Sequence, residues 1–423
     1  MKKNIISLLA LFIILSGTTI STSCKKEIVK QQVIQVKTGL DVLKQQNFEM
    51  LKGKRVGLVT NPTGIDASLK SNIDIMFLSE NVNLVGLFGP EHGVRGNFSA
   101  GDHITDQKDP KTGIQVHSLY GSNRKPSKEM LKDIDVMIYD IQDIGVRSYT
   151  YISTLGLVME ACAENNIELI VLDRPNPIGG NKVEGALVED KYISFVSQYP
   201  IPYVYGLTPG EFANYINNEG LLKNHAKCNL TVVKMEGWKR DMLFKDTGLY
   251  WVPTSPHIPR WNSSFYYAMT GIFGEINPSM VGIGYTLPFE VYMTTYADAD
   301  KLTDAMNAEN IEGVLFRPLH YKPYYSNNKG NELSGMQIYI TDYNKINLTK
   351  VEFKMIEIAH KLYPKHEIFK YNPSRHNMFD KVVGSNKIRK AFEKNYLYSD
   401  IQQMWEQPAI EFKEKSKKYY LYQ

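Results

Sequence analysis

Apolar and polar positions alternate in blocks through the first half of the chain. The short apolar runs are Arg55 to Thr60, Val82 to Phe88, Ile134 to Tyr139 and Glu168 to Leu172. Between the last two runs, Tyr151 to Asn165 carries apolar residues at helical spacing, which predicts a helix. Nearly continuous apolar strands that alternate with helices are typical of a parallel sheet covered on both faces. We therefore predict an α/β fold with a doubly wound, mostly parallel sheet.

Each of these runs ends in a polar, turn-rich cluster. The clusters are Asn61-Pro62-Thr63-Gly64, Gly89-Pro90-Glu91-His92-Gly93, Asp140 with the residues after it, and Asp173-Arg174-Pro175-Asn176-Pro177. One such cluster alone is equally well explained as a turn with solvated side chains. In doubly wound sheets, however, ligands bind beyond the carboxyl ends of the strands. Clusters that converge on one edge of the sheet therefore predict a ligand site there.

The second half of the chain has a different pattern. Helical spacing of apolar residues recurs along several segments, and one short stretch alternates as a strand does. The predicted helices are Asp300 to Glu309, Val351 to Leu362, Asp380 to Phe392 and Asp400 to Glu411, and the predicted strand is Gln337 to Ile340. This mixture predicts a second, smaller α+β domain. We place the two domains at residues 37–245 and 246–423.

The first residues have the pattern of an export signal. Two lysines precede a short apolar run from Ile5 to Leu15, and mostly small polar residues then lead to Cys24. The run is shorter than the ~20 residues that a membrane-spanning helix needs. A cysteine at this junction resembles the lipidation site of bacterial lipoproteins, and a simple cleaved signal is the alternative. We expect an export signal at 1–23, a lipid-anchored tether at 24–36, and a periplasmic or cell-envelope location.

Composition, charge and missing motifs argue against several classes of function. The chain has 49 Lys and Arg against 45 Asp and Glu, a net charge of +4 that lacks the concentrated basic character of nucleic-acid binders. Cys24, Cys162 and Cys228 form no pair or cluster with zinc-ligand spacing, and we expect the last two to be buried. The Gly-rich nucleotide fingerprints, the Gly-x-Ser-x-Gly elbow and His-Glu-x-x-His do not occur in the sequence. We expect no cofactor and no metal.

Carboxylates are prominent at the ends of the predicted strands. Glu91 follows the second apolar run, Asp140 and Asp143 follow the third, and Asp173 follows the fourth. Acid/base work on a glycosidic bond needs one carboxylic acid kept protonated and an ionised group nearby, and this set offers candidates for both. A structural ion pair or turn cap is the alternative for Asp173 beside Arg174, and Asp140 is also a candidate helix cap.

Several stretches carry a family resemblance. They are Leu87 to Gly93, Tyr139 to Tyr151, Leu172 to Pro177, Trp238-Lys239-Arg240, Ser255-Pro256, Phe316-Arg317-Pro318 and Tyr420-Leu421-Tyr422. On these motifs the chain resembles the DUF1343 family from Gly39 to its C-terminus. Members of that family include exo-β-N-acetylmuramidases, which remove N-acetylmuramic acid from the non-reducing end of peptidoglycan fragments. The resemblance implies a Rossmann-like domain, a smaller C-terminal domain and a cleft between them.

The resemblance also implies roles for individual residues. Glu91 is the expected catalytic carboxylate, for which we predict the role of general acid, with Asp140 and Asp143 as further catalytic candidates. Arg147 and Arg174 are the expected partners of the lactyl carboxylate of muramic acid, because a guanidinium fork matches a carboxylate. The other residues expected to bind the sugar are Asn61, His92, Tyr149, Asp173, Asn176, Tyr205, His257 and Arg260.

An aromatic-rich stretch surrounds the segment from Ser255 to Arg260. Its rings are Trp251, Trp261, Tyr266 and Tyr267. Rings of this kind are suited to stack on a sugar, and they are equally suited to pack between domains. Both interpretations remain open at this point.

The sequence departs from the family pattern at three places. Tyr205 stands where relatives tend to have a histidine, and His257 stands where they tend to have an asparagine. The family stretch Asn-Leu-Ser-Glu-Gly-Arg-Gly-Thr corresponds here to Asn277 to Tyr285, where Ile283 is among the residues that make the stretch apolar. Two hypotheses follow. The protein is an exo-acting glycosidase for muramic acid or a related amino sugar, or it is a lipid-anchored binder of amino-sugar and peptidoglycan fragments with weak or no turnover.

Overall fold

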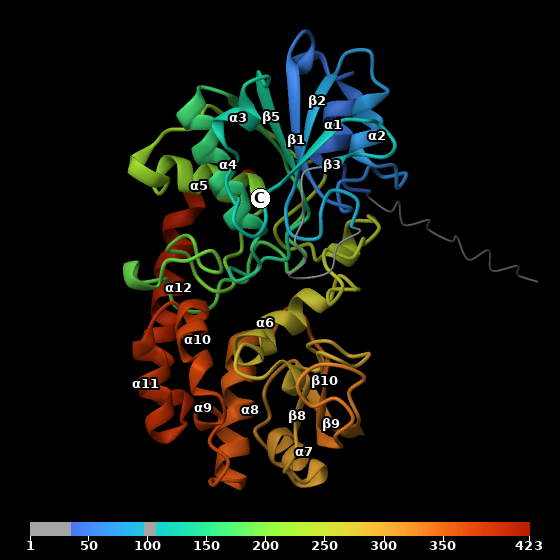
Figure 1. The fold of residues 1–423 in the computed structure, drawn as a ribbon. Coiled ribbons are helices and arrows are strands. Elements are labelled where there is room, and N and C mark those ends of the chain that lie inside the picture. The colour runs from blue at the N-terminus through green and yellow to red at the C-terminus, as the bar shows by residue number, and fades with distance from the viewer. Residues whose placement is uncertain (1–34, 97–106) are drawn as a thin grey trace, which may run out of the picture. The chain divides into compact units, whose positions relative to one another are not determined.

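The strands form two separate sheets (Figure 1). The structure is a computed structural model that describes residues 35–96 and 107–423. Its strands are β1 Arg55–Thr60, β2 Asn83–Gly89, β3 Gln107–Lys108, β4 Gln115–Ser118, β5 Val136–Asp140, β6 Glu168–Leu172, β7 Leu230–Val233, β8 Val291–Thr294, β9 Val314–Tyr321 and β10 Leu333–Ile340. The larger sheet has seven strands in the order β3-β4-β2-β1-β5-β6-β7, and the smaller has three in the order β8-β10-β9.

Helices occur throughout both halves of the described chain. They are α1 Gly39–Gln45, α2 Asn72–Phe77, α3 Lys128–Leu131, α4 Tyr151–Asn165, α5 Pro209–Asn218, α6 Ser263–Gly274, α7 Ala299–Ala308, α8 Leu348–Leu362, α9 Ile368–Tyr371, α10 His376–Val383, α11 Asn386–Asn395 and α12 Gln402–Ser416.

The larger sheet is parallel apart from β3, which runs antiparallel to β4. Its strands bury side chains on both faces. In β5, Met137 and Tyr139 belong to the hydrophobic cluster that includes α4 and α5, whereas Val136 and Ile138 belong to the cluster that includes α1 and α2. Figure 1 shows these two pairs of helices on opposite sides of the sheet. Burial on both faces explains why these strands are apolar at nearly every position.

The strand order fixes a topological switch point between β1 and β5. From β1 the chain moves outward to β2 and then returns to place β5 on the other side of β1. The carboxyl ends of both strands meet there, at Thr60 and Asp140, which are paired in the register of the sheet. Ligands of doubly wound proteins commonly bind at this position.

The second half is built around the three-stranded antiparallel sheet and the helices packed on it. Phe273 of α6 lies 5.6 Å from Phe353 of α8 and 5.2 Å from Phe379 of α10, measured between ring centroids. These rings belong to one buried cluster that extends to Trp405 of α12. The predicted fold class, a doubly wound α/β sheet with a smaller α+β part, is therefore confirmed.

Three predicted elements have the predicted limits, several others differ from theirs by a few residues, and one is divided in two. β1, β6 and α4 begin and end at the predicted residues. The predicted helix Asp380 to Phe392 is instead divided between α10 and α11. Gly384 ends α10 in the left-handed region at φ 93°, a conformation that interrupts a helix and that glycine adopts without steric cost.

Both ends of the described chain meet in one hydrophobic cluster. Val36, Met235, Trp238 and Tyr422 are buried together. The Tyr422 hydroxyl donates to Asp173 Oδ2 at 2.6 Å, so the C-terminus is held against the larger sheet. Val36 is fully buried and its N–H donates to the Thr247 carbonyl at 2.9 Å. This corrects the predicted end of the tether, because residue 36 already belongs to the fold.

The predicted export signal, Cys24 and most of the predicted tether lie outside the described residues. Among residues 35–96 and 107–423, no helix has the length and apolar character needed to cross a membrane.

Candidate functional site

A cavity of about 320 Å³ opens where loops from both halves of the chain meet. It is lined by residues 91–92, 148–151 and 255–258, together with Tyr267, Glu275 and Phe289. We call this cavity the central pocket. Its first two segments follow β2 and β5 of the parallel sheet, and the others come from α6 and the loops on either side of it. The chain therefore brings residues from distant parts of the sequence to one place.

Glu91 lies in the turn that follows β2. The N–H of Gly93 donates to the carbonyl of Pro90 at 2.9 Å, and His92 adopts a left-handed conformation with φ 73°. Glu91 is half-buried and lines the central pocket. Across the described part of the chain, its carboxylate has neither a hydrogen bond nor an ion pair. It is therefore available to a molecule bound in the pocket.

Glu275 supplies a second carboxylate to the central pocket. It follows the last residue of α6, and its Oε2 lies 2.5 Å from Arg375 Nη2. Arg375 Nε also donates to the Glu275 carbonyl at 2.7 Å, so the residue is held at two points. Burial raises the pKa of Glu275, and the ion pair with Arg375 opposes that rise. The pocket thus contains one unpartnered carboxylate and one fixed carboxylate.

Aromatic rings form one wall of the central pocket. The ring of Tyr149 lies 5.0 Å from that of Tyr151 and 5.8 Å from that of Tyr267, and Tyr267 lies 4.8 Å from Phe289. The hydroxyls of Tyr149 and Tyr151 donate to Thr254, at 2.7 Å to its Oγ1 and 2.5 Å to its carbonyl. Because the hydroxyls are engaged, these residues present mainly ring surface, which suits the apolar face of a sugar.

Two histidines supply the basic groups of the central pocket. Of the residues that line it in the described chain, His92 and His257 are the only basic ones. Burial lowers the pKa of His257, and the proximity of His92 lowers it further. His257 Nε2 also lies 2.7 Å from the Tyr325 hydroxyl. An anionic group in the pocket would favour the charged form of the His257 ring.

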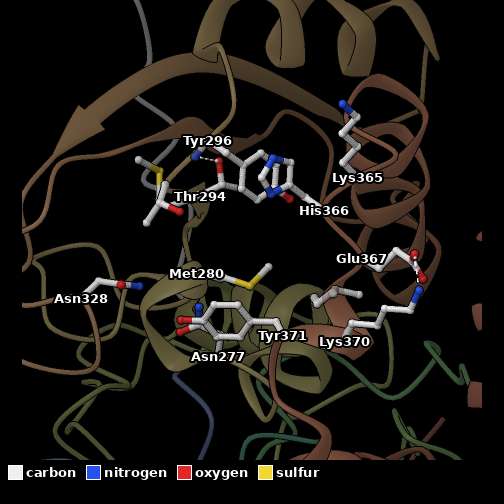
Figure 2. Close-up of a pocket in the computed structure, with 13 residues that line it drawn as sticks. Asn277, Met280, Thr294, Tyr296, Asn328, Lys365, His366, Glu367, Lys370 and Tyr371 are labelled. Carbon is white, nitrogen blue, oxygen red and sulfur yellow. Dashed lines mark hydrogen bonds and ion pairs between the residues drawn. The ribbon is translucent and has the colours of Figure 1, made fainter.

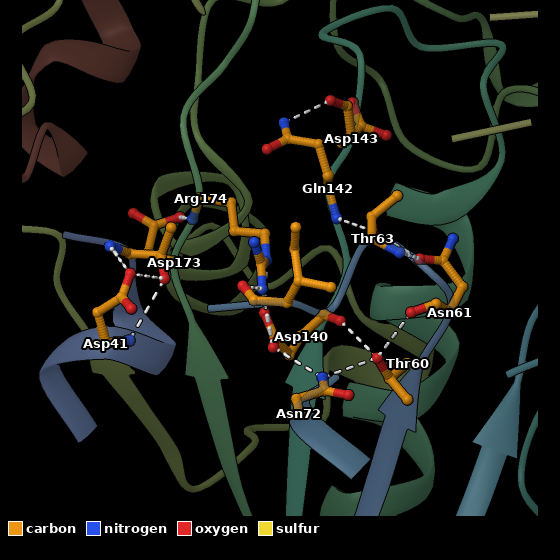
Figure 3. Close-up of polar contacts among 12 residues, drawn as sticks. Asp41, Thr60, Asn61, Thr63, Asn72, Asp140, Gln142, Asp143, Asp173 and Arg174 are labelled. Atoms are coloured by element: carbon orange, nitrogen blue, oxygen red, sulfur yellow. Dashed lines mark hydrogen bonds and ion pairs between the residues drawn. The ribbon is translucent and has the colours of Figure 1, made fainter. Parts of the chain in front are cut away.

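Asp140 and Arg174 do not reach the central pocket. They form an ion pair at the switch point, with Arg174 Nε donating to Asp140 Oδ1 at 2.6 Å and Nη2 donating to Oδ2 at 3.0 Å (Figure 3). Asn72 donates to the same Oδ2 at 2.8 Å, and Asp140 is fully buried. Both side chains are therefore engaged with each other, and the catalytic role of Asp140 and the lactyl contact of Arg174 stay predictions.

Asp143 is buried against Tyr205, away from the central pocket. The Tyr205 hydroxyl and the Gly145 N–H donate to Asp143 Oδ2, and Oδ1 is buried without a partner. Burial raises the pKa of Asp143 to about 6, against the effect of these hydrogen bonds. Both side chains belong to the interior and neither lines the central pocket, so the catalytic role of Asp143 and the sugar contact of Tyr205 stay predictions.

Asp173 stabilises the fold. Its Oδ1 accepts from the Gly210 N–H at 2.8 Å, and its Oδ2 accepts from Thr208 Oγ1 at 2.7 Å and from Tyr422. Asp173 thus caps the start of α5 and anchors the C-terminus, which fits the cap alternative, and its contact with the sugar stays a prediction.

Arg147 is also an internal residue. Its Nη1 donates to the carbonyls of Ala186 and Ile201, and its Nη2 donates to the carbonyl of Val382 at 2.6 Å. The side chain is fully buried. Burial lowers the pKa of Arg147 to about 9. Arg147 joins distant loops through their backbone, and its binding of the lactyl carboxylate stays a prediction.

The remaining predicted residues divide between the two places. His92, Tyr149 and His257 line the central pocket with Glu91, and their sugar contacts remain predictions. Asn61 is buried with its Oδ1 accepting from Thr63, and Asn176 is buried with its Nδ2 donating to the Leu207 carbonyl at 3.0 Å. Both side chains are held inside the fold, and their contacts with the sugar stay predictions.

Outside the pocket lie Arg260, which pairs with Glu290, and Ile283, which packs on the core of the second half. The sugar contact of Arg260 stays a prediction. Of the aromatic-rich stretch, Tyr267 lines the pocket. Tyr266 is buried in the core, Trp251 lies 5.0 Å from Phe244, and Trp261 lies 5.1 Å from Tyr343. Packing is therefore the better description of these three rings.

Sequence reasoning missed Glu275, Ser148 and Tyr151 as lining residues. Tyr151 begins the predicted helix α4, and Ser148 lies within a motif that carried the family resemblance, so position after a strand end was a usable signal. Glu275 had no such signal. It follows a helix, and its partner Arg375 lies 100 residues further along the chain.

A second cavity lies within the second half of the chain (Figure 2). It has a volume of about 370 Å³ and lies between the end of β8 and residues 365–371. The rings of Tyr296 and His366 stack there at 3.8 Å. The carboxylate lining it is that of Glu367, which pairs with Lys370 at 2.7 Å. A pair of carboxylates for acid/base chemistry is therefore found in the central pocket and not here.

The structure offers no metal centre among the residues it describes. In residues 35–96 and 107–423, no group of three or more His, Cys, Asp or Glu side chains is placed to hold a metal ion. Cys162 and Cys228 are buried, as predicted, and burial raises the pKa of both thiols.

Comparison with known proteins gives concordant results over nearly the whole chain. Residues 56–262 match a family model described as exo-β-N-acetylmuramidase NamZ, N-terminal, and residues 265–422 match its C-terminal counterpart. The chain is 41% identical over 425 residues to the peptidoglycan β-N-acetylmuramidase NamZ of Bacillus subtilis (strain 168), covering 100% of both chains.

Two solved structures are also similar. Both are DUF1343 family proteins from Bacteroides fragilis NCTC 9343. One is 52% identical with a TM-score of 0.88 and covers 92% of this chain and 100% of its own. The other is 30% identical with a TM-score of 0.71 and covers 92% of this chain and 99% of its own.

Proposed function

Because the chain belongs to the NamZ family of exo-β-N-acetylmuramidases, the family also called DUF1343, we propose that it is an exo-acting glycoside hydrolase. It releases N-acetylmuramic acid from the non-reducing end of peptidoglycan fragments. Full-length identity of 41% to the Bacillus subtilis muramidase supports both the reaction and the substrate class. The resemblance predicted from the sequence motifs is confirmed.

The observation that carries this function is the pair of carboxylates in an aromatic-walled pocket. Glu91 and Glu275 line the same cavity, and Tyr149 and Tyr267 form part of its wall. Glycosidic hydrolysis requires a proton donor and an ionised group on one substrate. A sugar ring additionally needs apolar surface and a few polar contacts, which the rings and histidines of this pocket provide.

The two carboxylates have different roles in the reaction. Glu91 is the general acid, because its carboxyl group is unpartnered in the described chain and can approach the glycosidic oxygen. It donates its proton to that oxygen as the bond to the anomeric carbon breaks. Glu275, fixed by Arg375, faces the positive charge that develops on the sugar. Water then adds to the anomeric carbon and gives up a proton, which restores the acid.

Recognition of the lactyl carboxylate falls to the histidines. Arg147 and Arg174 are engaged internally, whereas His92 and His257 line the pocket. A carboxylate between two imidazole rings accepts hydrogen bonds from their ring N–H groups. This arrangement distinguishes muramic acid from an amino sugar that lacks the lactyl group.

The test is Glu91→Gln assayed on a muramic acid-N-acetylglucosamine disaccharide, with the products separated by chromatography. The amide keeps the shape of the side chain and cannot donate a carboxylic proton, so kcat/KM should fall by about 10²–10⁴-fold. Glu80→Gln is the matched control, because Glu80 is an exposed carboxylate at a distance from the pocket lining. If the unaltered protein binds the disaccharide without cleaving it, the alternative of a binding protein is correct.

We further propose that the protein is exported and anchored by a lipid on Cys24. Supporting this is the sequence pattern around Cys24, and a buried residue of the described fold, Val36, follows shortly after it. Cys24→Ala should move the protein from the membrane fraction to the soluble fraction of the cell envelope. Unchanged fractionation would argue for the simple cleaved signal.

A further inference from the structure

A group of tyrosines outside the lining of the central pocket has no role in the mechanism above. The rings of Tyr285 and Tyr321 are stacked at 3.9 Å with an angle of 5° between their planes, and Tyr324 stacks beyond Tyr285 at 5.9 Å and 19°. The next residue, Tyr325, is 50% exposed, and Tyr324 is 68% exposed. Tyr321 is buried, so Tyr324 is the exposed end of this stack. We call the exposed rings of Tyr324 and Tyr325 the platform, because a flat or ring-shaped molecule can stack on such rings.

Tyr325 connects this platform to the central pocket. Its hydroxyl lies 2.7 Å from His257 Nε2, and its ring is stacked beside the His257 ring at 6.3 Å and 28°. His257 lines the central pocket. Only the His257 side chain therefore lies between Tyr325 and the pocket. Tyr325 is at the edge of the pocket and not in its interior.

The backbone holds the two exposed tyrosines in position. The Tyr324 N–H donates to the Gly284 carbonyl at 2.8 Å, and the Gly330 N–H donates to the Pro323 carbonyl at 3.0 Å, which closes the loop. Gly284 has φ 101°, and a Cβ there would lie 2.2 Å from the Tyr325 carbonyl oxygen. Only glycine fits this approach. The stretch from Asn277 to Tyr285, which departs from the family pattern, thus supports the tyrosine loop.

We propose that Tyr325, assisted by Tyr324, forms the subsite for the leaving-group sugar, the amino-sugar ring on the reducing side of the cleaved bond. The inference rests on the proposed function. An exo-acting enzyme encloses the terminal sugar in its pocket, so the next ring must lie at the pocket edge, where Tyr325 is placed. A hexose ring in the chair form presents an apolar face of C–H groups, and the exposed face of a phenol ring is complementary to it.

The test compares two substrates that share the terminal sugar. One is the muramic acid-N-acetylglucosamine disaccharide, and the other is β-N-acetylmuramyl fluoride, whose leaving group is too small to reach the loop. Tyr325→Ala should lower kcat/KM for the disaccharide by about tenfold and change that for the fluoride by less than about twofold. Tyr325→Phe keeps the ring and should retain most activity on both. Tyr371→Ala is the control, because Tyr371 is also exposed, at 59%, and lines the other cavity.

Each outcome has a distinct meaning. An equal loss on both substrates in Tyr325→Ala would overturn the subsite, because the ring would then act through His257 or the fold. Unchanged activity on the disaccharide would overturn it as well. Weaker inhibition of Tyr325→Ala than of Tyr371→Ala by free N-acetylglucosamine would support it independently of turnover rates. If the unaltered protein cleaves neither substrate, it is the proposed function that fails.

Discussion

Two groups of acidic side chains in this molecule have opposite surroundings in the structure. Asp140, Asp143 and Asp173 are almost fully buried in the first half and accept hydrogen bonds from neighbouring residues (Figure 3). Glu91 and Glu275 instead line a cavity, and Glu91 is unpartnered within the described chain. The difference teaches that a carboxylate at a strand end can serve the fold as well as the reaction. Its hydrogen-bond and ion-pair partners decide which of the two roles it has.

The first group also explains why the switch point is not the active site. The position between β1 and β5, where the topology favours a ligand, is filled by the Asp140–Arg174 ion pair and Asn72. The central pocket is displaced toward the loops that follow β2 and β5 and is completed by the second half of the chain. The mutations below separate the two groups of carboxylates, beginning with the largest expected effect.

Asp140→Ala should destabilise the protein strongly. The substitution leaves the Arg174 guanidinium buried without its carboxylate, which typically costs about 3–5 kcal/mol of the free energy of unfolding. Urea denaturation followed by tryptophan fluorescence measures the change. The double variant Asp140→Leu with Arg174→Met removes both charges and should recover part of the loss. A stable Asp140→Ala protein with abolished hydrolysis would instead return Asp140 to the catalytic group.

Glu275→Gln should reduce activity while leaving the fold largely intact. Removing a charged group that faces the developing positive charge lowers kcat by about 10²-fold in comparable cases. The ion pair with Arg375 is partly exposed, with 27% of the Glu275 side chain accessible, so the loss of stability should be small. Steady-state kinetics on the disaccharide and a thermal melt of the same sample test both halves of the prediction. A large fall in melting temperature would assign Glu275 to the structural group.

Asp143 should make stability depend on pH. Its pKa is raised to about 6 in the fold from an ordinary value of 3.8, so between about pH 4 and 6 the folded state holds a proton that the unfolded chain has lost. The free energy of unfolding therefore falls as the pH rises through this window. Unfolding curves at a series of pH values should show the unaltered protein losing roughly 2 kcal/mol more than Asp143→Asn. Parallel pH profiles for the two proteins would contradict this.

Arg260→Ala should have the smallest effect. Its ion pair with Glu290 leaves 54% of the arginine side chain exposed, and such pairs contribute at most about 1 kcal/mol. Because Arg260 lies outside the pocket lining, kcat/KM should also stay within about twofold of the unaltered value. A clear rise in KM for the disaccharide would show that Arg260 reaches the substrate after all.

The sequence predicts best those features that depend on local pattern. The limits of β1, β6 and α4 follow from apolar spacing, and the position of Glu91 follows from its place after a strand. Tyr149 also lines the pocket, and it lies in the loop that follows β5. Local spacing carries this information because burial on a sheet or helix face imposes a period on the chain.

Features that depend on distant partners could not be predicted in this way. Arg147 looks like a ligand-binding arginine, yet its donors meet carbonyls from three separate segments, the furthest of them Val382. Glu275 looks unremarkable, yet α6 and Arg375 place it in the pocket. From its place in the sequence Asp140 is a candidate helix cap, whereas in the structure its partner is Arg174. Such contacts are set by tertiary packing, and the spacing of residues in the sequence does not reveal them.

The hydrophobic cluster that contains Val36 and Tyr422 places the two ends of the folded chain next to each other. A protein fused to the carboxyl end would consequently emerge beside the point where the amino-terminal connection leaves the fold. Because the two ends are close, a short engineered peptide could join them. New termini could then be opened in a surface loop elsewhere in the sequence, which leaves the core intact.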